Sequence, residues 1–68
     1  MDAAKIDAWL ASLDEIGMRI AKLVEEAQET ISVEPSSEAS KTLDACLDSY
    51  LAALDNLSAA DKSLRTLR

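Results

Sequence analysis

The stretch IDAWLASLDEIGMRIAKLVEEAQETI, residues 6–31, decides the fold, because its apolar side chains recur every seven residues. Two such columns run along it. The first is Ile6, Leu13, Ile20 and Ala27, and the second is Trp9, Ile16, Leu23 and Thr30. Apolar columns separated by three and four residues are typical of a helix that packs lengthwise against another helix. The stretch therefore predicts a long helix whose seam follows these two columns.

The same repeat starts again after Pro35. Its columns are Leu43, Tyr50, Leu57 and Leu64, and Cys46, Ala53, Ala60 and Leu67. Because proline disfavours helical angles at the residue before it, the first helix must stop before Glu34. We expect helices at about residues 2–32 and about 37–67, with a turn at about 33–36. So short a connection forces the helices to lie antiparallel. The whole sequence therefore predicts a single all-α hairpin.

Capping residues support these boundaries. Asp2 is suited to cap the first helix, and Ser36 or Ser37 the second, because their side-chain oxygens accept from the free amides of a first turn. Glu38 would then stand in a first turn, where the helix dipole favours negative charge. The only interior helix breaker is Gly17, which costs about 1 kcal/mol relative to alanine.

A third apolar column widens the face of each helix. Its members are Leu10, Val24 and Ile31 in the first helix, and Leu47 and Leu54 in the second. A face this wide is what a helix needs when it touches two neighbours, and a lone hairpin offers each helix only one. We therefore expect a partner to supply two more helices and complete a four-helix bundle. The predicted partner interface is Ile6, Trp9, Leu10, Leu13, Ile16, Ile20, Leu23, Val24, Leu43, Leu47, Tyr50, Leu54, Leu57 and Leu64.

Length and composition also favour association. A chain of 68 residues buries only a modest core when it folds alone, and its single cysteine and lack of histidine exclude an internal disulfide and the common zinc sites. The lone Cys46 fits a reducing compartment. The partner can be a different chain or a second copy, so a homodimer stays open at this point.

The charge balance argues against several classes of partner. With 13 acidic and 7 basic residues, the formal net charge is −6, which disfavours direct contact with nucleic acid or an anionic membrane surface. No apolar run approaches the roughly 18 residues of a membrane span. The first residues also lack the basic start and apolar stretch of a signal peptide.

No residue pattern points to catalysis. Cys46 has no histidine to activate it and is better explained as a small apolar residue of the core. Glu25, Glu26 and Glu29 lack the shaped loop of a calcium site and are better explained as a solvated acidic surface. We therefore predict no catalytic, cofactor-binding or metal-binding residue, and a protein that is not an enzyme.

The segment LASLDEI, residues 10–16, followed by Ile20, Leu23 and the pair Glu26-Ala27, resembles the first helix of the Mediator subunit 11 family. The second helix is similar to that family in spacing only. The resemblance implies a nuclear subunit of the Mediator head module. Such a subunit pairs with Mediator subunit 22 to form a four-helix bundle and joins a larger scaffold subunit. The assembly links transcription activators to RNA polymerase II.

The leading hypothesis is thus a structural subunit that heterodimerises through its heptad apolar faces. Gly17 departs from the family, in which a polar and often acidic residue is usual at this place. Two alternatives stay open. One is a self-assembling hairpin similar to a secretion-needle subunit, and the other is a small acidic regulator or inhibitor in the bacterial cytoplasm.

Overall fold

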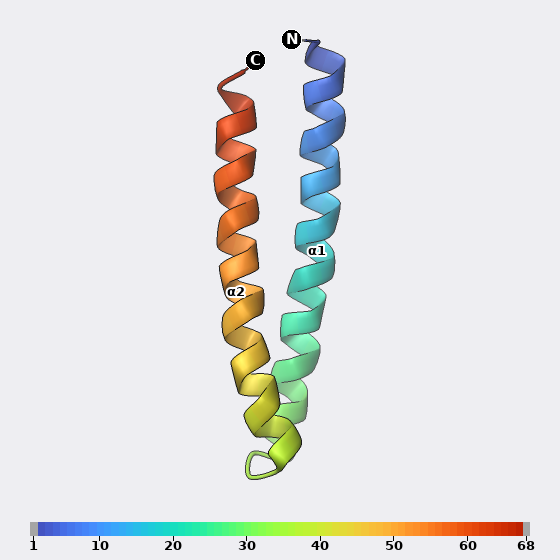
Figure 1. The fold of residues 1–68 in the computed structure, drawn as a ribbon. Coiled ribbons are helices and arrows are strands. Elements are labelled where there is room, and N and C mark those ends of the chain that lie inside the picture. The colour runs from blue at the N-terminus through green and yellow to red at the C-terminus, as the bar shows by residue number, and fades with distance from the viewer. Residues whose placement is uncertain (1, 68) are drawn as a thin grey trace.

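Two long helices make up almost all of the computed structural model, which describes residues 2–67. Helix α1 spans Ala3–Val33 and helix α2 spans Glu38–Arg65. They lie side by side and antiparallel, so that the two ends of the chain are at the same end of a rod (Figure 1). The Cα positions extend 51 Å along the rod and only 14 and 11 Å across it. The predicted all-α hairpin is confirmed, whereas the four-helix bundle stays a prediction.

The start of α1 is capped as expected. Asp2 has an extended backbone, and its carboxylate accepts a 3.0 Å hydrogen bond from the amide of Ala4. The Asp2 carbonyl accepts the amide of Ile6 at 3.2 Å, which begins the helical ladder. The cap thus satisfies amides that have no partner within the helix.

The turn is held by two serines. Ser37 caps α2 by accepting the Ser40 amide at 3.1 Å. Ser40 is completely buried, and its hydroxyl donates to the carbonyl of Glu34. Glu34 leaves the helical conformation directly before Pro35 while its amide still donates to Thr30 at 3.1 Å. Ser40 therefore links the end of α1 to the first turn of α2, a role that the sequence analysis missed.

Helix α2 ends at Arg65, slightly earlier than expected. Beyond it the amides of Thr66 and Leu67 donate to the carbonyls of Ser63 and Leu64, at 3.2 and 3.0 Å. Bonds that span three residues tighten the last turn and end the regular helix. The predicted end, at about residue 67, thus lies two residues beyond the last residue of the regular helix.

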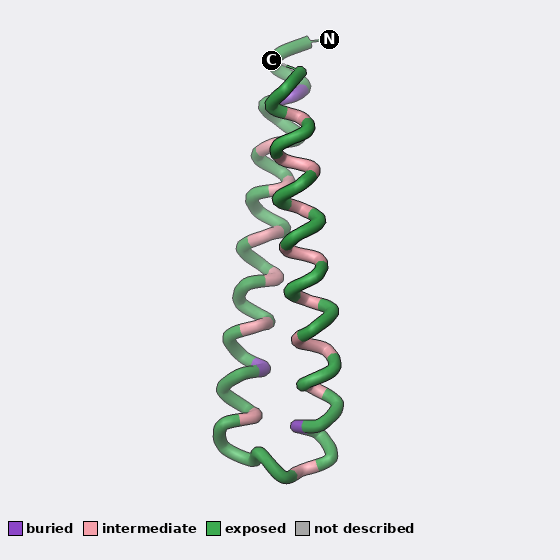
Figure 2. The backbone as a smooth tube through the Cα atoms, turned by 90° about the vertical axis from the view of Figure 1, so that its left-hand side faces the viewer, coloured by how far each residue is buried: buried purple, intermediate pink, exposed green. Residues whose placement is uncertain are grey.

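The seam between the helices is narrow and only partly closed. Figure 2 shows the buried and partly buried positions on the facing sides of the two helices, with exposed positions elsewhere. Among the described apolar residues, only Ile6 and Ala27 are buried. The α1 side of the seam is Ile6, Leu10, Leu13, Gly17, Ile20, Val24, Ala27 and Ile31. Along α2 the matching residues include Leu43, Leu47, Tyr50, Leu54, Leu57 and Leu64, all partly buried.

Candidate interaction site

One complete apolar column of α1 lies outside the seam. Trp9, Ile16 and Leu23 follow one another at intervals of seven residues, and they are 40 %, 45 % and 45 % exposed. The seven-residue repeat predicts this column in the seam beside that of Ile6, and the structure corrects that prediction. The column of Leu10 lies in the seam beside that of Ile6 instead. Because apolar columns flank Ile6 on both sides, the repeat alone does not select the side on which α2 packs.

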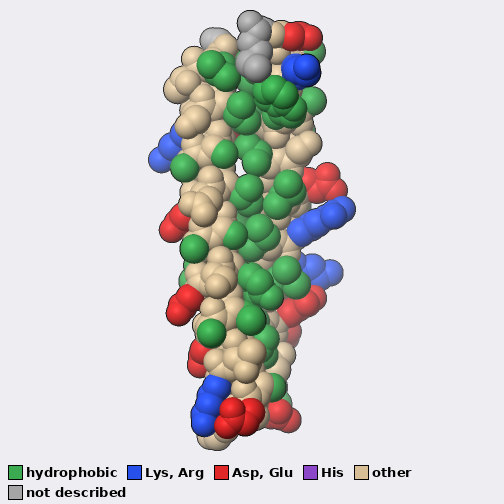
Figure 3. All heavy atoms as spheres, viewed as in Figure 1, with side chains coloured by type: hydrophobic (Ala, Val, Ile, Leu, Met, Phe, Trp, Pro, Cys, Tyr) green, Lys and Arg blue, Asp and Glu red, His purple; other side chains and the backbone are tan. Residues whose placement is uncertain are grey.

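On the same side of the hairpin, α2 presents small residues. Cys46, Ala53 and Ala60 are partly buried and share a helical face. Trp9 and Ala60 line one shallow groove, and Leu23 and Tyr50 line a second one toward the turn. We call the surface formed by Trp9, Ile16, Leu23, Cys46, Ala53 and Ala60 the Trp9 face. Figure 3 shows how apolar side chains gather in a band between the helices along one face of the rod.

The α1 border of the Trp9 face carries both signs of charge. Its members are Lys5, Ser12, Arg19 and Glu26, all exposed. The ammonium of Lys5 lies 5.9 Å from the centre of the Trp9 ring, within reach of a cation–π interaction. Arg19 donates to Glu15 at 2.9 Å, and Glu26 lines the groove beside Leu23. This border thus has a cation near the chain terminus and an anion toward the turn.

The α2 border of the Trp9 face carries no charge. Its members are Thr42, Ser49, Asn56 and Ser63, all exposed. The next column around the helix contains Ala45, Ala52 and Ala59. Helical spacing places the acidic Asp44, Asp48 and Asp55 on other sides of α2. A second helix can therefore approach this side of α2 without meeting a carboxylate.

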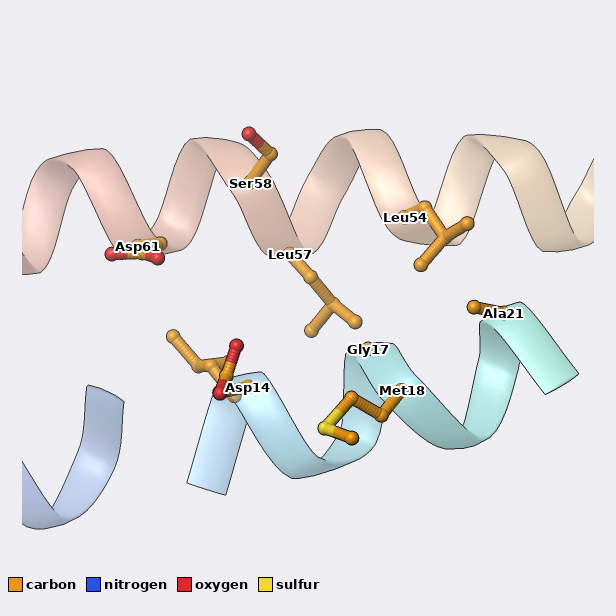
Figure 4. A pocket seen from close by; sticks show the side chains of 9 residues that line it. Asp14, Gly17, Met18, Ala21, Leu54, Leu57, Ser58 and Asp61 are labelled. Atoms are coloured by element: carbon orange, nitrogen blue, oxygen red, sulfur yellow. The ribbon is translucent and has the colours of Figure 1, made fainter. Parts of the chain in front are cut away.

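The opposite face of the hairpin has a groove that is more polar than the groove beside Trp9. Gly17 and Met18 of α1 lie across from Leu54 and Leu57 of α2 (Figure 4). Asp61 also lines this groove, and its carboxylate accepts from Arg65 at 2.6 Å. Because carboxylates line this groove and no charged residue lines the groove beside Trp9, this groove is the poorer docking surface for an apolar helix.

The predicted interface residues therefore fall into two groups. Trp9, Ile16 and Leu23 are exposed, whereas Ile6 is buried and the rest are partly buried along the hairpin. Leu57, for example, lines the groove between the two helices. For this second group, contact with a partner stays a prediction, because these side chains already lie against the other helix of the same chain.

Residues 2–67 offer little for sites of other kinds. No group of three or more histidine, cysteine, aspartate or glutamate side chains is arranged to hold a metal ion in this part of the chain. Neither described helix combines the length and apolarity needed to cross a membrane. Cys46 is partly buried on the Trp9 face. The Trp9 face is therefore the strongest candidate site of the described chain.

Comparison with family models, curated proteins and solved structures finds no match. The resemblance to Mediator subunit 11 accordingly stays a prediction that rests on the sequence of α1.

Proposed function

We propose that this chain is a non-catalytic interaction subunit whose Trp9 face is covered by two further helices, completing a four-helix bundle. The observation that carries the proposal is the line of three large apolar side chains, Trp9, Ile16 and Leu23, left 40–45 % exposed. A hairpin with so few fully buried residues gains little from its own core. Covering each of these side chains adds roughly 1 kcal/mol, since full burial of one contributes about 1.5–3 kcal/mol.

Pairing with Mediator subunit 22 in the nucleus is one form of this proposal. It is supported only by the sequence of residues 10–27. Mixing the purified chain with Mediator subunit 22 tests it directly, because a complex of one copy of each should be heavier than either chain alone.

The proposal is tested by comparing Ile16→Asp with Met18→Asp. Ile16 lies on the Trp9 face, whereas Met18 is 69 % exposed and lies on the opposite side of α1. An unpaired carboxylate in a dry interface costs several kcal/mol. We expect Ile16→Asp to lose association, measured as solution mass by light scattering, while Met18→Asp keeps the mass of the parent. Equal behaviour of the two variants would remove the Trp9 face from any interface.

A further inference from the structure

We infer that the occupant of the Trp9 face is a second copy of this chain, docked with the two turns at opposite ends of the bundle. The inference rests on the proposed function and names its partner. In this arrangement α1 lies antiparallel to α1 of the other copy, and α2 lies antiparallel to α2. A two-fold axis then passes between the two copies of Ile16 and, at about the same height on α2, between the two copies of Asn56.

The order of large side chains on α1 supports this docking. Trp9 and Leu23 are each seven residues from Ile16, so an antiparallel α1 pair places Trp9 of one copy beside Leu23 of the other. Each outer layer then holds one tryptophan and one leucine. If the turns lay at the same end, both tryptophans would fall in one layer and both leucines in another. Cores pack best when each layer fills its space evenly, which favours turns at opposite ends.

The charges on the α1 border support it independently. Lys5 and Glu26 lie ten or eleven residues from Ile16 on either side, in the same column. The antiparallel α1 pair therefore brings Lys5 of each copy beside Glu26 of the other, giving two ion pairs. With the turns at the same end, the α1 border would face the uncharged α2 border of the other copy, and neither pair would form. Charge complementarity of this kind fixes the register of an interface.

The α2 border also suits contact between two acidic copies. Two copies of a chain with a formal net charge of −6 repel each other unless the contact surface is free of like charges. Along the α2 border, Asn56 would meet Asn56 of the other copy and Ser49 would meet Ser63. In the neighbouring column, Ala53 would meet Ala60. Small and uncharged side chains let the two α2 helices approach closely without opposing carboxylates.

Cross-linking tests the geometry. We replace the native thiol with Cys46→Ala and then introduce Asn56→Cys beside the two-fold axis. The matched control introduces Ser58→Cys in the same background, since Ser58 lines the opposite groove. Mild oxidation should give a covalent dimer of the Asn56→Cys variant and leave the Ser58→Cys variant monomeric on a non-reducing gel. The reverse pattern would overturn this docking.

Charge reversal tests the register. Lys5→Glu or Glu26→Lys alone turns two attractions into two repulsions, which should raise the dimer dissociation constant roughly tenfold. The double variant Lys5→Glu/Glu26→Lys restores both pairs and should recover the affinity of the parent. A double variant as weak as the singles would overturn the proposed register.

The oligomeric state separates failure of this inference from failure of the proposed function. A poorly helical monomer at all concentrations would overturn the inference that a second copy is the partner. The proposed function would stand, with a different chain covering the Trp9 face. A monomer that is fully helical and stable would overturn both.

Discussion

At the scale of single residues, Gly17 leaves a gap beside α1, although its backbone conformation does not require glycine. Its φ is negative and helical, and a Cβ built on it would meet no atom within 4 Å. The glycine thus leaves the groove beside Leu54 and Leu57 unfilled. Alanine at this position would fit the backbone and remove the entropic penalty of glycine in a helix.

We therefore expect Gly17→Ala to stabilise the hairpin by about 1 kcal/mol, which raises the Tm by about 4–8 °C in a domain of this size. Thermal unfolding followed by circular dichroism measures the change. Because Gly17 faces away from the Trp9 face, the solution mass should not change. A lower Tm or a lost complex would show that a neighbouring helix uses this gap.

At the scale of elements, the turn depends on Ser40. This residue is completely buried, and its hydroxyl donates to the Glu34 carbonyl at the end of α1. We expect Ser40→Ala to lower the stability of the hairpin by about 1 kcal/mol, the usual net contribution of one such hydrogen bond.

The exposed Ser36 provides the matched control for this variant, and Ser36→Ala should leave the Tm unchanged. Equal Tm values for the two variants in thermal unfolding would mean that the buried hydroxyl does not hold the turn.

The sequence predicts the elements well because their signals are local. The seven-residue repeat identifies both helices, and Asp2 and Ser37 cap them as the local pattern indicates. Ser40 was missed because a serine in a first turn is ordinary, and its burial arises only when α1 folds back over it. The end of α2 is predicted only to within a few residues, since propensity does not show where the last turn tightens.

The exposed column could not be identified from the sequence for a physical reason. Leu10 and Trp9 lie on opposite flanks of Ile6, and both flanks are apolar. One neighbouring helix covers only part of a face this wide. Packing of the whole hairpin decides which side of α1 remains uncovered by α2. The structure shows that this is the side of Trp9 and Ile16.

At the scale of the whole molecule, the central claim is that this thin rod needs further helices over its Trp9 face. The most direct test follows solution mass, helicity and Trp9 fluorescence together over a dilution series of the unmodified chain. We predict a helical dimer with blue-shifted Trp9 emission at high concentration. Dilution should lower the mass and helicity together and shift the emission to the red. A monomer that stays fully helical, with water-exposed Trp9 emission at every concentration, would contradict the claim.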